Sequence, residues 1–212
     1  MAHVFLDLDG TLSDPWEGIT RSVMQALEQV GVTPPPAETL GWVIGPPLIE
    51  SFAKLGVDDV EAALGHYRAR YADVGLFENH VYDGIEAALA GMRDAGHVLC
   101  LVTAKPHVFA RRITERFGLD AYLAEQFGPE LDGTRNDKAE LLAHALAVTG
   151  AEAARSVMVG DRHHDFDAAR ANGVKALAVR WGYGAPEEWA QADAICDAPG
   201  ELCAAIGALL DR

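Results

Sequence analysis

Cationic residues are scarce in this sequence of 212 residues. It has 17 lysine and arginine residues against 32 aspartate and glutamate residues, so its formal net charge at pH 7 is -15 with histidine neutral. Proteins that bind the phosphate backbone of nucleic acids need clustered basic side chains. We therefore expect no nucleic-acid partner, and any anion that the chain binds must be held by a small local group of residues.

Cysteine and long hydrophobic runs are also lacking. The cysteines Cys100, Cys196 and Cys203 are odd in number and form no C-x-x-C pair, so the pattern favours buried, reduced thiols over a disulfide framework. Asp7 interrupts the apolar start of the chain, and no segment has the about 20 apolar residues that a membrane span needs. We expect a cytoplasmic protein with no membrane partner.

What the sequence does contain is a series of short apolar runs that alternate with helix-like patterns. The predicted strands are residues 4–8, 98–103, 156–160, 176–181 and 194–197, with a weaker candidate at 125–128. The predicted helices include 84–95, 108–117, 138–149 and 165–172, and several are followed by a glycine, as left-handed caps require: Gly96, Gly118, Gly150 and Gly173. This alternation predicts an α/β fold with a Rossmann-like parallel sheet core.

Residues 15–80 break the alternation. Apolar residues repeat there at helical spacing without a convincing strand, and the segments "TPPPAET" and "IGPPL" mark turns. A crossover between parallel strands needs only about a dozen residues. We therefore predict an inserted all-helical cap domain at 15–80 and a core formed by 1–14 and 81–212. We expect the core of the cap to include the aromatic residues Trp16, Trp42, Tyr67 and Tyr71, with a position facing the substrate as the alternative for Trp16.

Polar side chains follow several of the predicted strands. Asp7 and Asp9 end the first strand, Thr103 and Ala104 end the second, and "GDRHHD" supplies Asp161 and Asp165 after the strand at 156–160. Ligands of open parallel sheets bind beyond the carboxyl ends of the strands, so we expect these groups to share one crevice. Side chains alternate along a strand with period two, which would place Asp7 and Asp9 on one face.

Four carboxylates in one crevice repel each other and lose hydration. A divalent cation would remove this conflict, and an all-oxygen ligand set of Asp7, Asp9, Asp161 and Asp165 favours Mg²⁺ over zinc. Adjacent histidines on a turn cannot easily face one metal, so we interpret His163 and His164 as rim residues. For the charged residues near the crevice we favour a surface position: Lys105, His107, Arg111 and Arg162.

Lys138 completes a predicted phosphate site. In "RNDKAE" either Asn136 or Asp137 caps a helix whose first turn contains Lys138, and the free amides of such a turn also favour an anion. With Thr103 nearby, the site could hold a phosphoryl group while Asp7 attacks it and Asp9 transfers protons. Each residue also has a structural interpretation: "DLDGT" as a turn, Thr103 as a strand end, Lys138 as a solvated residue and Asp165 as a helix cap.

Together these motifs resemble the haloacid dehalogenase-type phosphatase superfamily, and in particular its members similar to phosphoglycolate phosphatase and 5'-nucleotidase with a helical cap. The motifs are "DLDGT", "LVTAK", Lys138 in "RNDKAE", and "GDRHHD". The resemblance spans nearly the whole chain. It implies that Asp7 is the nucleophile and Asp9 the general acid and base. It also implies that Thr103, Ala104 and Lys138 bind phosphate, and that Mg²⁺ is held by Asp7, the backbone carbonyl of Asp9 and Asp161, with Asp165 in support.

The resemblance therefore predicts a Mg²⁺-dependent phosphatase of a small phosphorylated metabolite, acting as a monomer or homodimer. Phosphoglycolate and nucleoside 5'-monophosphates are both candidate substrates. Two alternatives stay open at this point. One is a sugar-phosphate mutase on the same core, and the other is a phosphoacceptor or binding module without turnover. The acid at Asp9 and the inserted cap favour the hydrolase.

Overall fold

The structure is a computed structural model that describes residues 1–211. Its contacts divide the chain into two compact units, one formed by residues 1–13 with the chain from Val81 onward, and the other by Asp14–His80. The chain passes from one unit to the other in two short strands, β2 (Ser13–Asp14) and β3 (His80–Val81), which pair with each other.

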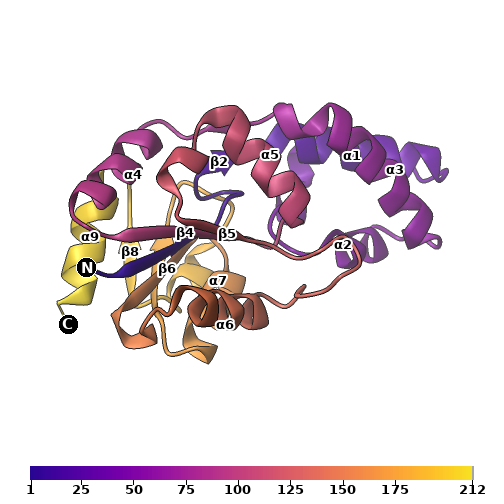
Figure 1. The fold of residues 1–212 in the computed structure, drawn as a ribbon. Coiled ribbons are helices and arrows are strands. Elements are labelled where there is room, and N and C mark those ends of the chain that lie inside the picture. Colours follow the sequence, from indigo (N-terminus) through magenta and orange to yellow (C-terminus); the bar gives the residue numbers. More distant parts are fainter. Residues whose placement is uncertain (212) are drawn as a thin grey trace. The chain divides into compact units, whose positions relative to one another are not determined.

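The first unit is built on a six-stranded sheet with the order β5-β4-β1-β6-β7-β8. Every strand pair in it is parallel, which confirms the predicted α/β class. Figure 1 shows the strands fanning out with helices on both sides. The strands are β1 (His3–Leu6), β4 (Val98–Val102), β5 (Glu125–Phe127), β6 (Ser156–Gly160), β7 (Lys175–Val179) and β8 (Ala194–Cys196).

The central strand β1 lies between β4 and β6, with Phe5 opposite both Cys100 and Met158. These strands are largely buried on both faces, and for that reason they are apolar after their first residues and do not alternate with polar residues. Phe5, Cys100 and Met158 belong to one hydrophobic cluster, which also contains Leu142 and Phe166 from two helices. The apolar residues of β1 thus fit its central position in the sheet.

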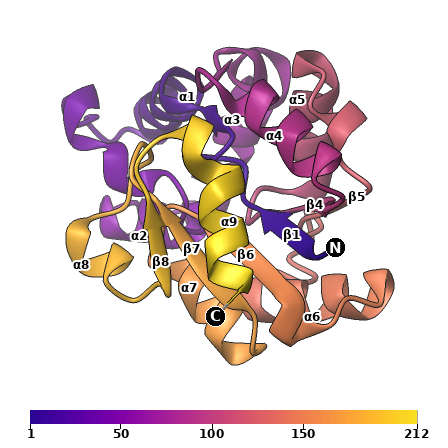
Figure 2. The ribbon, with the colours of Figure 1, turned by 90° about the vertical axis from the view of Figure 1, so that its left-hand side faces the viewer.

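Helices cover both faces of the sheet. The cluster that contains Phe5 is closed by α6 (Lys138–Thr149) and α7 (His163–Ala171). The other face is covered by α4 (Ile85–Asp94) and α9 (Leu202–Leu210), which contact each other, and α5 (His107–Phe117) packs on β5. Figures 1 and 2 show α4 on the opposite side of the strands from α6 and α7. A short helix, α8 (Pro186–Trp189), precedes β8.

The ends of several elements differ from the sequence prediction by one or two residues; β7, for example, ends at Val179 and not at residue 181. The strand β1 ends at Leu6 and not at residue 8, because the chain turns there: the N–H groups of Thr11, Leu12 and Ser13 all donate to the carbonyl oxygen of Leu8. The helix α7 begins two residues earlier than predicted. The predicted glycine caps are confirmed, since Gly96, Gly118, Gly150 and Gly173 all have positive φ.

The second unit consists of α1 (Trp16–Gln29), α2 (Leu48–Lys54), α3 (Val60–Asp73) and short 3-10 turns. The helix α1 buries one stripe, which includes Ile19, Val23 and Leu27, and packs against α3. The ring of Tyr67 stacks on that of Tyr71 with centroids 5.1 Å apart. Both tyrosines are buried as predicted.

The two tryptophans of this unit correct the prediction. Trp42 is 37% exposed, and the ammonium of Lys54 lies over its ring at 5.8 Å from the ring centroid. Trp16 is half-buried in the first turn of α1. Neither side chain is part of the buried core, because Trp42 lies in a short 3-10 turn and Trp16 lines a cavity. An aromatic side chain in a helical segment is therefore not by itself evidence of a core position.

The three cysteines are free. Cys100 and Cys196 are buried, as predicted, whereas Cys203 is half-buried. Among residues 1–211, no helix is both long enough and apolar enough to cross a membrane.

Candidate active site

Asp7 is the first residue beyond β1. Its backbone N–H donates to the carbonyl oxygen of Val159 over 3.0 Å, which continues the pairing of β1 with β6 by one residue. Its side chain is buried, and Oδ2 lies 3.0 Å from Nζ of Lys138. The parallel sheet therefore places Asp7 just beyond the carboxyl end of its central strand, where the side chain meets a buried cation.

Lys138 is the first residue of α6, and Asp137 caps that helix by accepting the N–H of Glu140 over 2.9 Å. The ammonium of Lys138 also lies 2.5 Å from Oδ1 of Asp165. Burial alone would lower the pKa of Lys138, but the charges of Asp165 and Asp7 outweigh it and raise that pKa above its ordinary value. Lys138 is therefore a buried group whose charged form is favoured, and not a solvated helix residue.

Asp161 follows β6 and is held by backbone and side-chain donors from the chain after β7. Its Oδ2 accepts the N–H of Tyr183 over 2.6 Å, and its carbonyl oxygen accepts the indole N–H of Trp189 over 3.2 Å. Asp165 is the third residue of α7, where its Oδ2 accepts the N–H of Arg162 over 3.2 Å. Arg162, and not Asp165, is therefore the N-cap residue, but the side chain of Asp165 still contributes to the cap as the third residue of a capping box.

Glycines allow the chain to close around Asp161. Gly10 has φ +80°, and a Cβ atom there would collide with the carboxylate of Asp161. A Cβ atom on Gly182 would collide with the same carboxylate and with the carbonyl oxygen of Gly10. The segment of Gly182 and Tyr183 was not identified from the sequence. Its "WGYG" composition, directly after a buried strand, is the signal that could have revealed a close approach of backbone to the site.

Asp7, Asp161 and Asp165 form a group that could hold a metal ion. One carboxylate oxygen from each lies within 4.8 Å of the others, and all three residues are buried. Oδ1 of Asp7 and Oδ1 of Asp161 are shielded from solvent and have no hydrogen-bond partner in the part of the chain that the structure describes. Buried polar atoms without partners are rare, so these oxygens fit the role of ligands.

The electrostatics of the site also fit a divalent cation. Burial raises the pKa of Asp161 well above its ordinary value, and the charges of Asp165 and Asp7 add to this effect. Burial likewise raises the pKa of Asp165 to about 6, although Lys138 opposes the shift. The ammoniums of Lys105 and Lys138 pair with Asp9, Asp7 and Asp165, and Arg162 adds a positive charge that acts on Asp161. The four carboxylates outnumber these cations, and a divalent cation would offset the excess of negative charge.

Asp9 lies apart from the three-carboxylate group. Because β1 ends at Leu6, the strand alternation that was predicted to align Asp9 with Asp7 does not reach it, and Asp9 instead forms an isolated bridge with Ser13. Its Oδ2 lies 2.7 Å from Nζ of Lys105. Burial raises the pKa of Asp9, and the charge of Lys105 counteracts part of that rise. The carboxylate of Asp9 is thus paired with a cation of its own.

Lys105 is the residue that sequence reasoning misplaced. It was predicted to lie on the surface, yet its side chain is only 5% exposed. Its backbone N–H donates to Oγ1 of Thr103 over 3.3 Å, so the chain turns tightly through Ala104 after β4. Thr103 is buried and donates its own N–H to Phe127 on β5. The position of Lys105 two residues after Thr103 in "LVTAKP" was the available signal.

Arg162, His163 and His164 form a rim beside the carboxylates. Nε of Arg162 lies 2.9 Å from Glu188, and Nδ1 of His163 lies 3.1 Å from the same carboxylate. Burial lowers the pKa of His164 to about 4, and the neighbouring His163 adds to the shift. Neither histidine belongs to the three-carboxylate group. Arg162 is largely buried in its ion pair and is therefore not the surface residue that was predicted.

The remaining candidates stay outside the cluster. His107 is half-buried at the start of α5, where its N–H donates to the carbonyl oxygen of Pro129. Arg111 is exposed, as predicted, and faces Glu115 on the same helix.

Known proteins are similar to this chain in sequence and in fold. Residues 4–179 match the family described as haloacid dehalogenase-like hydrolase. A 5'-nucleotidase of Pseudomonas aeruginosa is 42% identical over 98% of this chain and 93% of its own. A tyrosine-protein kinase PtkA of Mycobacterium tuberculosis is 41% identical over 85% of this chain, which corresponds to 62% of that protein.

A crystal structure of "a predicted phosphatase" from Clostridium acetobutylicum has a TM-score of 0.93, with 35% identity over 98% of this chain and 99% of the other. The match to the family covers most of the sequence and contains each of the carboxylates and lysines of the site. The chain therefore belongs to the haloacid dehalogenase-like hydrolase family, among its phosphatases.

Proposed function

We propose that this protein hydrolyses phosphate monoesters of small metabolites by carrying the phosphoryl group transiently on Asp7. The observation that carries the proposal is the pairing of two buried carboxylates with separate lysines, Asp7 with Lys138 and Asp9 with Lys105, beside the group of Asp7, Asp161 and Asp165. One carboxylate is thereby kept available for attack and the other for proton transfer. Carboxylates can serve both as nucleophiles, including in aspartyl-phosphate formation, and as general acids and bases.

Asp7, Asp161 and Asp165 would hold a Mg²⁺ ion, together with the backbone carbonyl of Asp9 that the family resemblance implies. When bound, this ion would offset negative charge on the transferring phosphoryl group. Lys138 would contact the same group, since its ammonium already lies within 3.0 Å of Asp7. Thr103 and the turn at Ala104 would bind the remaining phosphoryl oxygens.

In the first step an oxygen of Asp7 attacks phosphorus, and the bond from phosphorus to the leaving oxygen breaks. Asp9 donates its proton to that oxygen, so the alcohol departs neutral. The rise in the pKa of Asp9 that burial causes favours its protonated form for this step. In the second step water attacks the phosphorylated Asp7, Asp9 takes the proton, and inorganic phosphate leaves with the Asp7 carboxylate restored.

The second unit, Asp14–His80, would act as the cap that selects the leaving group and limits the access of water. Nucleoside 5'-monophosphates are supported as substrates by the name of the relative from Pseudomonas aeruginosa. Phosphoglycolate is the alternative that the sequence motifs suggested.

The test is a phosphate-release screen over nucleoside 5'-monophosphates, ribose 5-phosphate, phosphoglycolate and p-nitrophenyl phosphate, with Mg²⁺ and with EDTA. We expect steady turnover that depends on Mg²⁺ and that is lost in Asp7→Asn. The matched control is Asp94→Asn, which changes an exposed aspartate on α4 in the same way. Appreciable turnover by Asp7→Asn would refute the mechanism.

The same screen separates the alternatives. A phosphoacceptor module would release at most one equivalent of phosphate, and a mutase would give an isomeric sugar phosphate in place of inorganic phosphate. Incubation with ATP and a tyrosine-containing peptide tests for the tyrosine-kinase activity that the name of the mycobacterial relative states. Peptide phosphorylation faster than phosphate release would contradict the proposal.

A further inference from the structure

One peptide group beside the carboxylate cluster is bonded at both of its polar ends. It joins Asp161 to Arg162, the two residues between β6 and α7. Its carbonyl oxygen accepts the indole N–H of Trp189 over 3.2 Å. Its N–H donates to Oδ2 of Asp165 over 3.2 Å. Because a peptide group is planar, the contact that orients its carbonyl also orients the N–H that holds Asp165.

The surroundings of Trp189 fix its indole. The ring packs against the hydrophobic cluster that contains Phe5, and the guanidinium of Arg180 lies 5.7 Å from the ring centroid. A Cβ atom on Gly184 would collide with the carbonyl oxygen of Asp161 and come within 2.6 Å of the indole nitrogen. Glycine at this position therefore leaves room for the hydrogen bond between Trp189 and Asp161.

The preceding residue, Glu188, holds the side chain of Arg162. Nε of Arg162 lies 2.9 Å from Oε2 of Glu188, and Nη2 lies 3.3 Å from Oε1. Such a two-point contact fixes a guanidinium in direction as well as in place. Nδ1 of His163 lies 3.1 Å from the same carboxylate. Two consecutive residues of α8 therefore hold the connection between β6 and α7, one by its backbone and the other by its side chain.

This connection controls two of the three carboxylates that could hold a metal ion. Asp161 lies in it, and Asp165 is bonded to its N–H group. Oxygens of these two carboxylates and of Asp7 lie within 4.8 Å of one another. Like charges at such a distance repel each other, so a connection with fewer contacts could turn a carboxylate away from the cluster. The contacts from α8 oppose this rotation.

We propose that Trp189 and Glu188 are positioning residues, which hold the peptide group between Asp161 and Arg162 so that the carboxylates of the cluster fit Mg²⁺. The inference rests on the metal site of the proposed function and goes beyond it, because neither residue of α8 belongs to the group of three carboxylates. Mg²⁺ requires nearly ideal octahedral geometry, whereas Ca²⁺ accepts a flexible ligand arrangement. Loss of positioning should therefore weaken the binding of Mg²⁺ more than that of Ca²⁺.

The first test measures the binding of Mg²⁺ and of Ca²⁺ to the metal-free protein by titration calorimetry. Trp189→Phe keeps an aromatic ring and the net charge but removes the indole donor. Loss of a partner that orients a metal ligand weakens binding by about 10–100-fold, so we expect the Kd for Mg²⁺ to rise at least about tenfold and the Kd for Ca²⁺ to rise much less. An unchanged Kd for Mg²⁺, or an equal rise for both ions, would overturn the inference.

The matched control for this variant is Trp42→Phe, which changes an exposed tryptophan of the Asp14–His80 unit in the same way. We expect it to bind both ions as the wild type does. A rise in the Kd for Mg²⁺ as large as that of Trp189→Phe would contradict a specific role of Trp189.

The second test concerns Glu188 and uses its neighbour as the control. Glu188→Gln and Glu187→Gln each remove one negative charge from α8, but Glu187 is exposed and is not the residue that pairs with Arg162. A difference between the two variants in the Kd for Mg²⁺ therefore reports the contact and not the charge. We expect the Kd of Glu188→Gln to be about tenfold higher. Equal values would overturn the role of Glu188.

A merely structural role predicts a different result. It would lower the Tm of the metal-free protein and leave the Kd of the folded protein unchanged. Under the positioning role, the Mg²⁺ concentration that gives half the maximal rate with p-nitrophenyl phosphate rises by the same factor as Kd, while kcat at saturating Mg²⁺ stays near that of the wild type. Thermal melts show which variants are folded. If Trp189→Phe is unfolded, Glu188→Gln and its control decide the question.

Failure of this inference can be told apart from failure of the proposed function. Wild-type turnover and Mg²⁺ binding, with equal Kd values in all folded variants, would remove the positioning role and leave the phosphatase proposal intact. Absence of Mg²⁺ binding by the wild type would remove the metal site itself, and the inference with it.

Discussion

The ammonium nitrogen of Lys105 lies 2.7 Å from Oδ2 of Asp9, and both side chains are almost fully buried. This ion pair lies beside a second one, between Lys138 and Asp7. The proposed acid and the proposed nucleophile therefore each have a separate cation. A buried ion pair is sensitive to the loss of one partner, because the remaining charge stays in a poorly solvated place.

Removal of Lys105 should destabilise the protein through Asp9. We expect Lys105→Met to lower the free energy of unfolding by about 3 kcal/mol, and the double variant Lys105→Met with Asp9→Asn to recover most of that loss. Urea denaturation of the single and double variants measures both values. If the loss of unfolding free energy in the double variant equals the sum of the losses in the Lys105→Met and Asp9→Asn single variants, the ion pair does not couple these residues.

Replacement of Asp9 should affect substrates according to their leaving groups. Asp9→Asn removes the proton donor, so hydrolysis of an alkyl phosphate should slow by about 100-fold or more, while p-nitrophenyl phosphate, whose leaving group needs no proton, should slow far less. The measurement is kcat/KM for both esters. An equal loss for both would contradict the acid role of Asp9.

Metal binding should appear in thermal stability as well as in activity. Mg²⁺ at ten times its dissociation constant should raise Tm by about 4 °C, because a ligand that binds only the folded state stabilises it. Asp161→Asn should abolish most of this rise, whereas Asp94→Asn should retain it.

The metal-free protein provides a second readout for the same variant. Because burial and neighbouring carboxylates raise the pKa of Asp161, its charge is unfavourable without a cation. Metal-free Asp161→Asn should therefore melt no lower than metal-free wild type at pH 7. A fall of several degrees would show that Asp161 has a structural role and not a ligand role.

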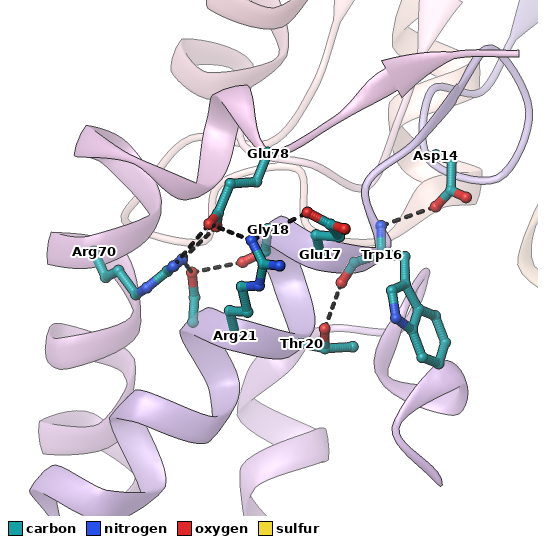
Figure 3. Close-up of polar contacts among 9 residues, drawn as sticks. Asp14, Trp16, Glu17, Gly18, Thr20, Arg21, Arg70 and Glu78 are labelled. Carbon is teal, nitrogen blue, oxygen red and sulfur yellow. Dashed lines mark hydrogen bonds and ion pairs between the residues drawn. The ribbon is translucent and has the colours of Figure 1, made fainter. Parts of the chain in front are cut away.

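The ion pair of Glu78 with Arg70 (Figure 3) should make the stability of the Asp14–His80 unit depend on pH. Hydrogen bonds from Arg70, against a smaller opposing effect of burial, lower the pKa of Glu78 below its ordinary value. A carboxyl whose pKa is lower in the folded state contributes stability above its unfolded pKa, and that contribution disappears as the pH falls through the folded pKa.

Glu78→Gln should accordingly destabilise the protein by about 1 kcal/mol at pH 7. The difference between variant and wild type should shrink as the pH falls below 4.5, the ordinary pKa of this group, toward pH 3. Urea denaturation at several pH values measures it. A difference that stays constant with pH would show that the ion pair is not its source.

Much of the fold was predictable from local sequence. The strands β4, β6 and β8 and the helix α6 lie where the apolar runs and the cap at Asp137 predicted them, because buried parallel strands and capped helices carry strong local signals. Asp7, Asp161 and Lys138 could be assigned to one site because the carboxyl ends of parallel strands meet at one edge.

Other features depended on distant contacts. The burial of Lys105 depends on its ion pair with Asp9, which lies nearly a hundred residues away in the sequence. Without knowledge of that partner, a lysine after a strand is predicted to lie on the surface. The contact of Tyr183 with Asp161 depends on Gly10 and Gly182. Glycine is required at these positions because two backbone segments approach closely there, which only the folded chain shows. Trp42 was likewise expected in the core of the cap, although its ring lies beside Lys54 at the surface.

The sequence by itself determined the parallel sheet, its order of elements along the chain and the nature of its acidic site, since these follow from local patterns of burial and from which residues end each strand. Only the tertiary structure decided which cation each carboxylate faces, which oxygens lack partners, and that Trp189 holds the carbonyl oxygen of Asp161. Those properties depend on distances between residues far apart in the chain, and such distances leave no periodic signal in the sequence.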